Sequence, residues 1–263
     1  NKRMNQFIAS LLLAAIQGFS EWLPISSSGH LVLFSKIFGF DNSVAFDVVL
    51  HFGTLMAVFV YFGRDIVNII EDYLNGRWKS ENARLGYLLL ISSIPAAIIG
   101  FLFKEYFELA FESLAIVAIG LGITSLFLFI SSLNFKINRK KMPKQSDAWL
   151  IGLAQAVAIF PGISRSGSTI SAGLLRGLDN KTAVKFSFLM SIPVIFGASI
   201  LEIGSERLPS SYIFPALVSF VFGLIAIHFL LKVVVNNMKS LRWFALYCLL
   251  LAIGIGIWLF LIK

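Results

Sequence analysis

The sequence has 263 residues, of which 57% are hydrophobic and 14% are charged, and its formal net charge is +8. A soluble globular domain has about 45–50% apolar and about 25% charged residues. The composition therefore excludes a soluble enzyme, a disordered protein and a disulfide-rich secreted domain, and a single cysteine, Cys248, can close no disulfide within the chain. In so apolar a chain the positive charge indicates membrane topology rather than nucleic-acid binding. We predict an all-α integral membrane protein surrounded by membrane lipids, with no nucleic acid partner.

Six stretches are apolar enough to cross a bilayer, which takes about 20 residues. They cover residues 44–62, 86–103, 113–133, 186–201, 212–231 and 243–262, and residues 182–184 can extend the fourth. The sequence therefore predicts six transmembrane helices.

Two further apolar stretches are interrupted by loops rich in serine and glycine. Residues 7–19 run into a polar segment before the apolar sequence resumes at Leu31, and residues 148–160 run into another before it resumes at Ile170. Pro, Gly and hydroxyl-bearing residues break a helix and leave backbone groups that need partners. Such backbone is tolerated at membrane depth only where it is buried in protein or lines a wet cavity. Each stretch is therefore predicted to form a re-entrant helix-loop-helix hairpin.

The two interrupted stretches also resemble each other. A shift of 138 positions pairs Gln17 with Gln155, Trp22 with Phe160, Ser26 with Ser164, Ser28 with Ser166 and Gly29 with Gly167. Three predicted spans lie between the copies, so the second copy enters from the opposite face. We therefore expect an inverted-topology repeat within one membrane domain, with residues 1–133 as the first half and residues 134–263 as the second.

The placement of lysine and arginine predicts the orientation of the chain. Most of the 22 basic residues fall in segments on one side of the predicted spans. By the positive-inside rule this side is cytoplasmic and both termini lie outside. The first hairpin then opens from the outside and the second from the cytoplasm.

Ionisable groups at membrane depth cost roughly 2.5–3.5 kcal/mol each on insertion scales, which makes them candidates for function. Glu21 closes the first broken helix and Arg165 lies in the second broken loop. If the two loops meet, a carboxylate and a guanidinium share one polar cavity with an imidazole and a set of hydroxyls. These further members are Ser26, Ser27, Ser28, His30, Ser164, Ser166, Ser168 and Thr169.

This set of side chains suits a phosphate group. The planar guanidinium of Arg165 matches phosphate oxygens, and helix starts after a Gly/Ser turn offer free N–H groups. Ser27 is a candidate nucleophile if a base lies within hydrogen-bond reach, and His30 can act as acid or base near neutral pH. Gln17 and Glu21 share one helical face, where they could hold Mg²⁺ or Ca²⁺ beside substrate phosphates.

Plainer interpretations stay open for several of these residues. Glu21 and Arg165 could form a purely structural ion pair, and serines in a helix-breaking loop are often only capping groups. Asp47 and His51, four residues apart, could form a second polar pair facing the cavity, although a position near the membrane interface is the more usual interpretation. A lipid flippase or transporter is an alternative class, because inverted repeats with broken helices are transporter architecture.

The sequences of the two loops resemble a known family. Residues 17–30, QGFSEWLPISSSGH, resemble the Glu/Gln-x-x-x-Glu motif and serine-rich stretch of the undecaprenyl pyrophosphate phosphatase (BacA, bacitracin resistance) family. Residues 161–169, PGISRSGST, resemble its Pro-Gly-x-Ser-Arg-Ser-x-x-Thr motif. The resemblance covers the whole chain. It implies a multi-pass inner-membrane enzyme that hydrolyses undecaprenyl diphosphate to the monophosphate, recycles the cell-wall lipid carrier and requires a divalent cation. With the orientation predicted above, the active site would face the outside.

The resemblance also implies roles for individual residues. Glu21, with Gln17, would bind metal or transfer protons, Ser27 would be the nucleophile and His30 the base or acid. Arg165 would clamp phosphate, with support from Ser26, Ser28, Ser164, Ser166 and Thr169. Many family members have Glu at the position of Gln17, and because an amide cannot act as a base, Glu21 must carry any acid–base work of that pair. The sequence leaves open whether Ser27 or a water attacks phosphorus and whether the protein forms a homodimer.

A second lipid phosphatase family is an alternative to the BacA family. The type-2 phosphatidic acid phosphatases also use a Ser-Gly-His element, but they expect a Lys-bearing first motif, and His and Asp at set distances after Ser-Arg. No such pattern follows Ser164 and Arg165 in this sequence.

Overall fold

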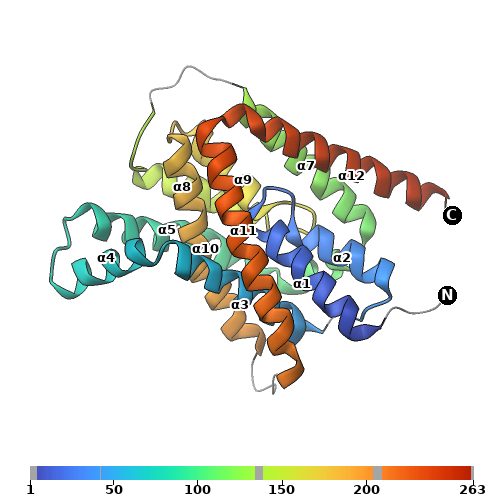
Figure 1. Ribbon diagram of the computed structural model, residues 1–263. Coiled ribbons are helices and arrows are strands. Elements are labelled where there is room, and N and C mark those ends of the chain that lie inside the picture. The colour runs from blue at the N-terminus through green and yellow to red at the C-terminus, as the bar shows by residue number, and fades with distance from the viewer. Residues whose placement is uncertain (1–4, 42, 134–138, 204–208, 262–263) are drawn as a thin grey trace.

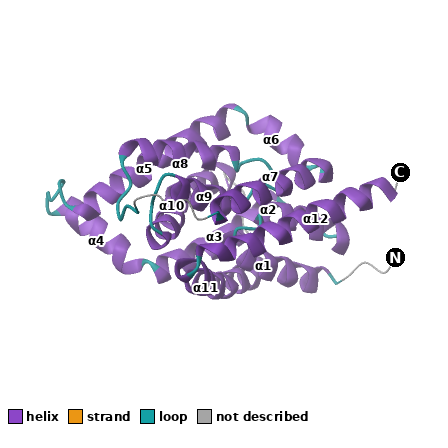
Figure 2. Ribbon diagram, turned by 90° about the horizontal axis from the view of Figure 1, so that it is seen from above, coloured by secondary structure: helices purple, strands orange, loops and turns teal. Residues whose placement is uncertain are grey.

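The computed structural model describes residues 5–41, 43–133, 139–203 and 209–261, with only the backbone described for residues 201–203. In this part of the chain the regular structure is helical, and the strand-like pairing is a single bridge between Lys140 and Leu178. Figure 2 shows helices joined by short loops throughout.

Six helices among the described residues are long and apolar enough to cross a membrane, which confirms the number of predicted spans. They are α3 (Val44–Tyr61), α5 (Glu81–Leu102), α7 (Leu114–Ser132), α10 (Asn180–Ile203), α11 (Ile213–Asn236) and α12 (Leu241–Leu261). Helix α5 begins earlier than the apolar stretch predicts, because the Ser80 side chain accepts a hydrogen bond from the Ala83 N–H and caps the helix there.

The two interrupted stretches form four shorter helices, arranged as two hairpins. The first hairpin consists of α1 (Gln6–Trp22) and α2 (Ser27–Phe38), and the second of α8 (Gln145–Val157) and α9 (Arg165–Leu175). The two helices of each hairpin pack against each other. The breaks between them fall at the predicted Pro- and Gly-containing loops, residues 23–26 and 158–164.

Two short helices that the sequence analysis did not anticipate connect the spans. Helix α4 (Gly63–Leu74) packs on α5 and extends with it away from the rest of the molecule, at the left of Figure 1, and α6 (Lys104–Phe111) follows α5. Helix α4 is amphipathic, with Ile66 and Ile69 packed against the core while half of its residues are exposed. The 3₁₀ helices η1 (Ser210–Tyr212) and η2 (Met238–Ser240) precede α11 and α12.

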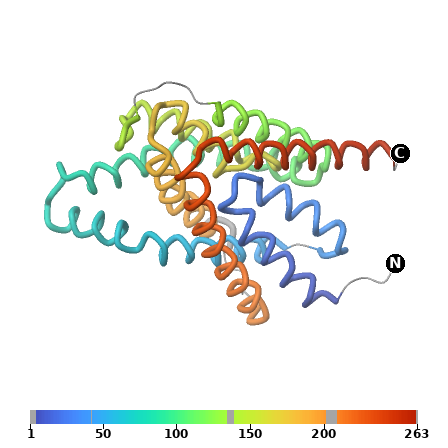
Figure 3. The backbone as a smooth tube through the Cα atoms, turned by 45° about the horizontal axis from the view of Figure 1, so that its top comes forward, coloured from blue at the N-terminus to red at the C-terminus, as the bar shows by residue number. Residues whose placement is uncertain are grey.

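Pairs of long helices far apart in the sequence hold the bundle together. Helix α12 lies along α7, and α11 lies along α1 and α3 (Figures 1 and 3). The Ser125 hydroxyl on α7 donates a hydrogen bond of 2.8 Å to the Ala245 carbonyl on α12. The start of α1 and the end of α12 lie at the same end of the molecule, opposite the turn between α4 and α5.

Candidate active site

The first hairpin carries a tight loop between Glu21 and the start of α2. Ser26 adopts a left-handed backbone conformation with φ 69°. Among the described residues other than glycine, it alone has a positive φ. A left-handed conformation costs roughly 1–2 kcal/mol for an L-residue with a side chain, and such outliers gather at functional sites. The Ser26 hydroxyl accepts a hydrogen bond from the Gly29 N–H at 3.2 Å and so caps α2. The loop therefore presents Ser27 as the first residue of that helix.

The second hairpin has a similar turn, which is fixed by α7. Gly162 has φ +88° and its backbone lies so close to the Val117 carbonyl that a Cβ there would collide with it. Thr124 on α7 donates to the Gly162 carbonyl at 3.0 Å and accepts from the Ser164 N–H at 2.8 Å. The Ser164 hydroxyl accepts from the Gly167 N–H at 3.0 Å and caps α9. Arg165 is thereby placed at the first position of α9.

The two loops touch each other, so the starts of α2 and α9 lie together. A Cβ added to Gly29 would come within 3.2 Å of the Gly162 Cα. Across the same contact, the Ser166 hydroxyl donates to the Leu23 carbonyl at 3.1 Å. The site predicted from the sequence requires the two loops to meet, and the structure confirms that they do.

A buried ion pair joins the two hairpins. Arg165 Nη2 donates to Glu21 Oε1 at 2.6 Å, and the two side chains are 15% and 6% exposed. The Arg165 guanidinium also lies over the ring of Trp22, 5.0 Å from its centroid, which is a favourable cation–π arrangement. The predicted proximity of the carboxylate and the guanidinium is therefore confirmed.

The second oxygen of the Glu21 carboxylate accepts hydrogen bonds from two other side chains. Glu21 Oε2 accepts hydrogen bonds from the Ser27 hydroxyl at 2.6 Å and from Gln17 Nε2 at 3.0 Å. The one-turn spacing does place Gln17 and Glu21 on one helical face, as the sequence predicts. Ser27 is half-buried, and the carboxylate holds its hydroxyl in place.

The other predicted hydroxyls, except that of Ser168, are engaged in other hydrogen bonds. Ser28 Oγ lies 3.2 Å from Ser26 Oγ, and Ser166 Oγ lies 3.3 Å from Ser164 Oγ. The Thr169 hydroxyl lies 2.6 Å from the Ser187 hydroxyl on α10 and donates to the Arg165 carbonyl. Ser168 Oγ is buried with no hydrogen-bond partner.

His30 belongs to a different set of contacts from Ser27 and Glu21. Its Nδ1 lies 2.7 Å from the Ser26 carbonyl, and its Nε2 lies 2.7 Å from the Tyr247 hydroxyl on α12. The His30 and Tyr247 rings are stacked, and His30 is only 4% exposed. The imidazole therefore fastens the first turn of α2 to α12.

His51 is the histidine that reaches the carboxylate. Its Nε2 lies 3.6 Å from Glu21 Oε2, and its side chain is 33% exposed. The sequence analysis placed His51 more naturally near the membrane interface, because the spacing to Asp47 carries no information about which neighbour α3 faces. Three other contributors were missed, Thr124, Ser187 and Tyr247, since single polar residues in apolar spans give no periodic signal.

The arrangement offers no preformed site for a divalent cation. Both oxygens of Glu21 already accept hydrogen bonds, one of them from a guanidinium, and Gln17 turns its amide nitrogen rather than its oxygen toward the carboxylate. Within the described ranges, no group of three or more His, Cys, Asp or Glu side chains could hold a metal ion. The cation requirement therefore stays a prediction from the family resemblance.

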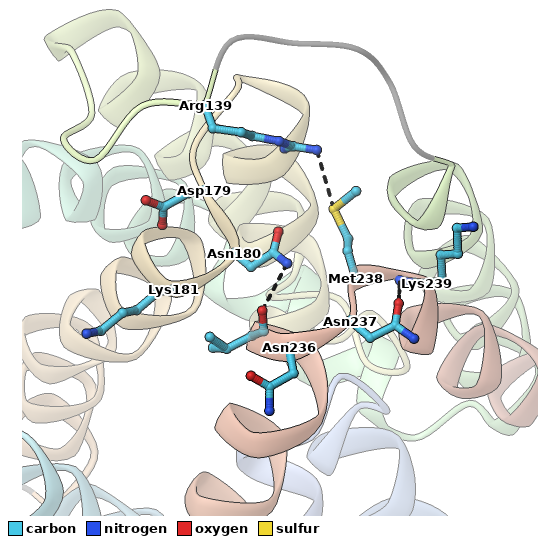
Figure 4. Close-up of a pocket in the computed structure, with 9 residues that line it drawn as sticks. Arg139, Asp179, Asn180, Lys181, Asn236, Asn237, Met238 and Lys239 are labelled. Atoms are coloured by element: carbon cyan, nitrogen blue, oxygen red, sulfur yellow. Dashed lines mark hydrogen bonds between the residues drawn. The ribbon is translucent and has the colours of Figure 1, made fainter.

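A polar pocket of about 520 Å³ lies elsewhere, at the turns before α10 and between α11 and α12 (Figure 4). Arg139, Asp179 and Lys181 are among its lining residues. Asn180 Nδ2 donates to the Val235 carbonyl at 3.2 Å across it. The pocket shares no residue with the Glu21 cluster.

The fold and the site together define a polytopic membrane protein with a buried carboxylate–guanidinium pair beside a half-buried serine. The sequence model of "Bacitracin resistance protein BacA" matches residues 10–254, and the chain belongs to this family.

Relatives named undecaprenyl-diphosphatase match over nearly their whole length. The protein of Methanococcus vannielii is 39% identical over 245 residues, which covers 92% of this chain and 96% of the relative. Those of Thermosipho africanus and Korarchaeum cryptofilum are 42% and 41% identical, with 92% and 94% of this chain and 96% and 97% of the relatives covered.

Proposed function

We propose that this protein is an integral membrane phosphatase that hydrolyses undecaprenyl diphosphate to undecaprenyl phosphate and inorganic phosphate. Membership of the BacA family and the name shared by its relatives support this substrate. The observation that carries the proposal is the cluster in which Ser27 and Arg165, each at the first position of a helix, contact the two oxygens of Glu21. The activity regenerates the lipid carrier used in cell-wall synthesis.

The terminal phosphate would bind between the two helix starts. The first N–H groups of a helix have no partner within it, and the caps on Gly29 and Gly167 leave the amides of Ser27 and Ser28 in α2, and of Arg165 and Ser166 in α9, to face an anion. The Arg165 guanidinium carries five N–H donors. Its contacts with Glu21 and Ser187 leave others for phosphate oxygens.

Ser27 is the proposed nucleophile. Its Oγ bonds to the terminal phosphorus while the bond from that phosphorus to the bridging oxygen breaks, which releases undecaprenyl phosphate. Water then cleaves the phosphoserine to give inorganic phosphate. Phosphoryl transfer depends mainly on positioning and on stabilising the charge of the transferred group, and Arg165 and the helix starts supply both.

The membrane arrangement is part of the proposal. The two hairpins would be re-entrant and related as an inverted repeat, with the basic ends of the spans in the cytoplasm, both termini outside and the site open to the outer face of the plasma membrane. The polyprenyl tail would lie against the apolar, exposed faces of the surrounding helices.

The test is phosphate release from undecaprenyl diphosphate by the purified protein in detergent. A phosphatase releases phosphate without a membrane gradient, whereas a flippase or transporter does not. Ser27→Ala should abolish release, and Ser131→Ala is the matched control, because the Ser131 hydroxyl bonds only within its own helix. A parallel sample with a chelator tests the cation requirement. No phosphate release by the wild-type protein would overturn the proposal.

A further inference from the structure

His51 is the member of the site with no role so far. It lies on α3, between the two hairpins in the sequence, and its side chain is 33% exposed, compared with 15% for Arg165 and 6% for Glu21. It is therefore the more accessible of the two ionisable groups that contact the carboxylate. A group in this position can meet both Glu21 and an entering substrate.

The hydrogen bond of the other ring nitrogen determines the state of His51. Its Nδ1 lies 2.8 Å from the Asp47 carbonyl oxygen. A carbonyl oxygen only accepts hydrogen bonds, so Nδ1 must carry a hydrogen. In the neutral imidazole the lone pair is then on Nε2, the nitrogen that faces Glu21.

Ser27 and His51 meet at the same carboxylate oxygen. Glu21 Oε2 accepts the Ser27 hydroxyl at 2.6 Å and lies 3.6 Å from His51 Nε2. The other oxygen, Oε1, is held by Arg165 at 2.6 Å. Because Arg165, Gln17 and Ser27 all donate to this carboxylate, the imidazole is the better final acceptor for a proton that leaves Ser27.

His30 cannot take this part without losing its contacts. Its Nδ1 faces the Ser26 carbonyl, so that nitrogen carries the hydrogen, and its Nε2 accepts from the Tyr247 hydroxyl. Both nitrogens are therefore engaged, in a side chain that is almost completely buried. The geometry separates a histidine that holds the loop in place from one that is free to exchange a proton.

We propose that His51 accepts the proton of Ser27 during the attack on the phosphate; this inference rests on the proposed function. As Ser27 Oγ bonds to the terminal phosphorus, the bridging bond breaks and the lipid monophosphate leaves with the electron pair of that bond. The proton passes from Oγ by way of Glu21 Oε2 to His51 Nε2. In the second step the oxygen of a water bonds to phosphorus while the bond from phosphorus to Ser27 Oγ breaks. Both hydrogens of the water leave with inorganic phosphate as H2PO4−, and His51 returns its proton to Oγ.

Two substitutions separate proton transfer from hydrogen bonding. His51→Gln places an amide beside Glu21 that can bridge to the carboxylate but cannot accept a proton. His51→Asn can keep the bond to the Asp47 carbonyl but lacks the reactive nitrogen. Each should lower kcat for undecaprenyl diphosphate at least about 100-fold, the usual range for loss of an acid–base group. KM should change little, and thermal unfolding in detergent should stay close to that of the wild type.

Small-molecule rescue supplies a readout that a structural role would not change. Imidazole added to His51→Ala should restore part of kcat, and added to Ser27→Ala should restore none. His228→Gln is the matched control, because His228 is exposed on α11, where its Nδ1 lies 3.5 Å from the Tyr61 hydroxyl. Its kcat should equal that of the wild type.

The outcomes distinguish this inference from the proposed function. If the wild-type protein releases no phosphate, the proposed function fails. If the wild type is active and His51→Gln turns over at close to the wild-type rate, the proposed function stands and the role of His51 is wrong. A fall in kcat for His51→Gln and His51→Asn, with rescue of His51→Ala, supports the inference.

Discussion

Two carboxylates in this protein accept the same three kinds of hydrogen bond, yet they do different work. Glu21 accepts from a guanidinium, a serine hydroxyl and a side-chain amide. Asp72, at the end of α4, does the same, with donors Arg77, Ser80 and Asn82. The donors of Asp72 all come from the ten residues that follow it, whereas Arg165 is 144 residues away from Glu21 in the sequence.

The difference lies in what each cluster depends on. The Asp72 cluster closes the turn between α4 and α5 and needs only that turn to form. The Glu21 cluster exists only while two loops from different hairpins touch, and it alone has an additional imidazole, His51, at the carboxylate. A local cluster stabilises the fold, and a long-range one can also create a site.

The largest expected effect comes from removing the ion pair of the long-range cluster. Glu21→Met and Arg165→Met should each abolish phosphate release, and each should lower the free energy of unfolding by about 3–5 kcal/mol, because the remaining charge is buried without a partner. The double variant should regain much of that stability, because no unpaired charge remains, but no activity. Thermal unfolding and phosphate release in detergent measure the two quantities. An active double variant would mean that the pair is only structural.

A smaller effect is expected when the contact between the loops is disturbed. Gly162→Ala places a methyl group against the Val117 carbonyl in a backbone conformation with φ +88°. Gly76→Ala is the matched control, since Gly76 has φ +68° and an added Cβ would meet only Trp78 Nε1 at an ordinary contact distance of 3.8 Å. Overpacking costs typically about 1–3 kcal/mol, so Gly162→Ala should be less stable than Gly76→Ala by that amount and should also lose activity. Equal unfolding temperatures for the two variants would contradict this account.

Removal of the anchor on α7 should have a smaller effect on activity, because it loosens the second loop without overpacking it. Thr124→Val leaves the Gly162 carbonyl and the Ser164 N–H without the partner they have now. Each buried group left unpaired costs about 1–3 kcal/mol, and the displaced Arg165 should raise KM for undecaprenyl diphosphate. Thr124→Ser keeps the hydroxyl and should behave as the wild type in both measurements. A Thr124→Val variant with unchanged KM would show that the loop is held by other contacts.

The smallest effect is expected at the local cluster. Hydrogen bonds from Ser80 and Asn82, and then from Arg77, hold the pKa of Asp72 below its ordinary value of 3.8. A lowered pKa in the folded state stabilises the fold at pH values above 3.8, and the stabilisation is lost as the pH falls through the lowered value.

Asp72→Asn should therefore unfold at a lower temperature than the wild type at about pH 7, and the difference should narrow as the pH falls below the ordinary value of about 3.9 for aspartate. Phosphate release should be unchanged, unlike that of Glu21→Met. A difference in unfolding temperature that does not depend on pH would rule out the carboxylate as its source.

The sequence predicted the ionisable residues of the site, because a charged group at membrane depth is energetically costly. A carboxylate and a guanidinium within apolar stretches, each beside a Pro- and Gly-containing break, had few structural explanations, and the structure brings Glu21 and Arg165 together. The six spans follow from hydrophobic length alone. Helix α4 was missed because its apolar stripe is short and half of its residues are exposed.

The partners of the two histidines could not be predicted. Tyr247 is 217 residues from His30, and nothing in an apolar span indicates which neighbour a single polar side chain faces. The same limit applies to His51, whose contact with Glu21 depends on how α3 packs against the first hairpin. Residue type identified the candidates, while helix packing decided which histidine reached the carboxylate.

The pairing of α7 with α12 has a consequence for how the enzyme can move. Thr124 on α7 hydrogen-bonds to the second loop, and Tyr247 on α12 hydrogen-bonds to His30, which holds the first loop. The Ser125 hydroxyl links α7 to α12 by a further hydrogen bond. Both loops are therefore held by the same pair of helices, α7 and α12. Because α7 and α12 can move together as one unit, motions of the outer helices that admit or release a long lipid can leave the distance between Glu21 and Arg165 unchanged.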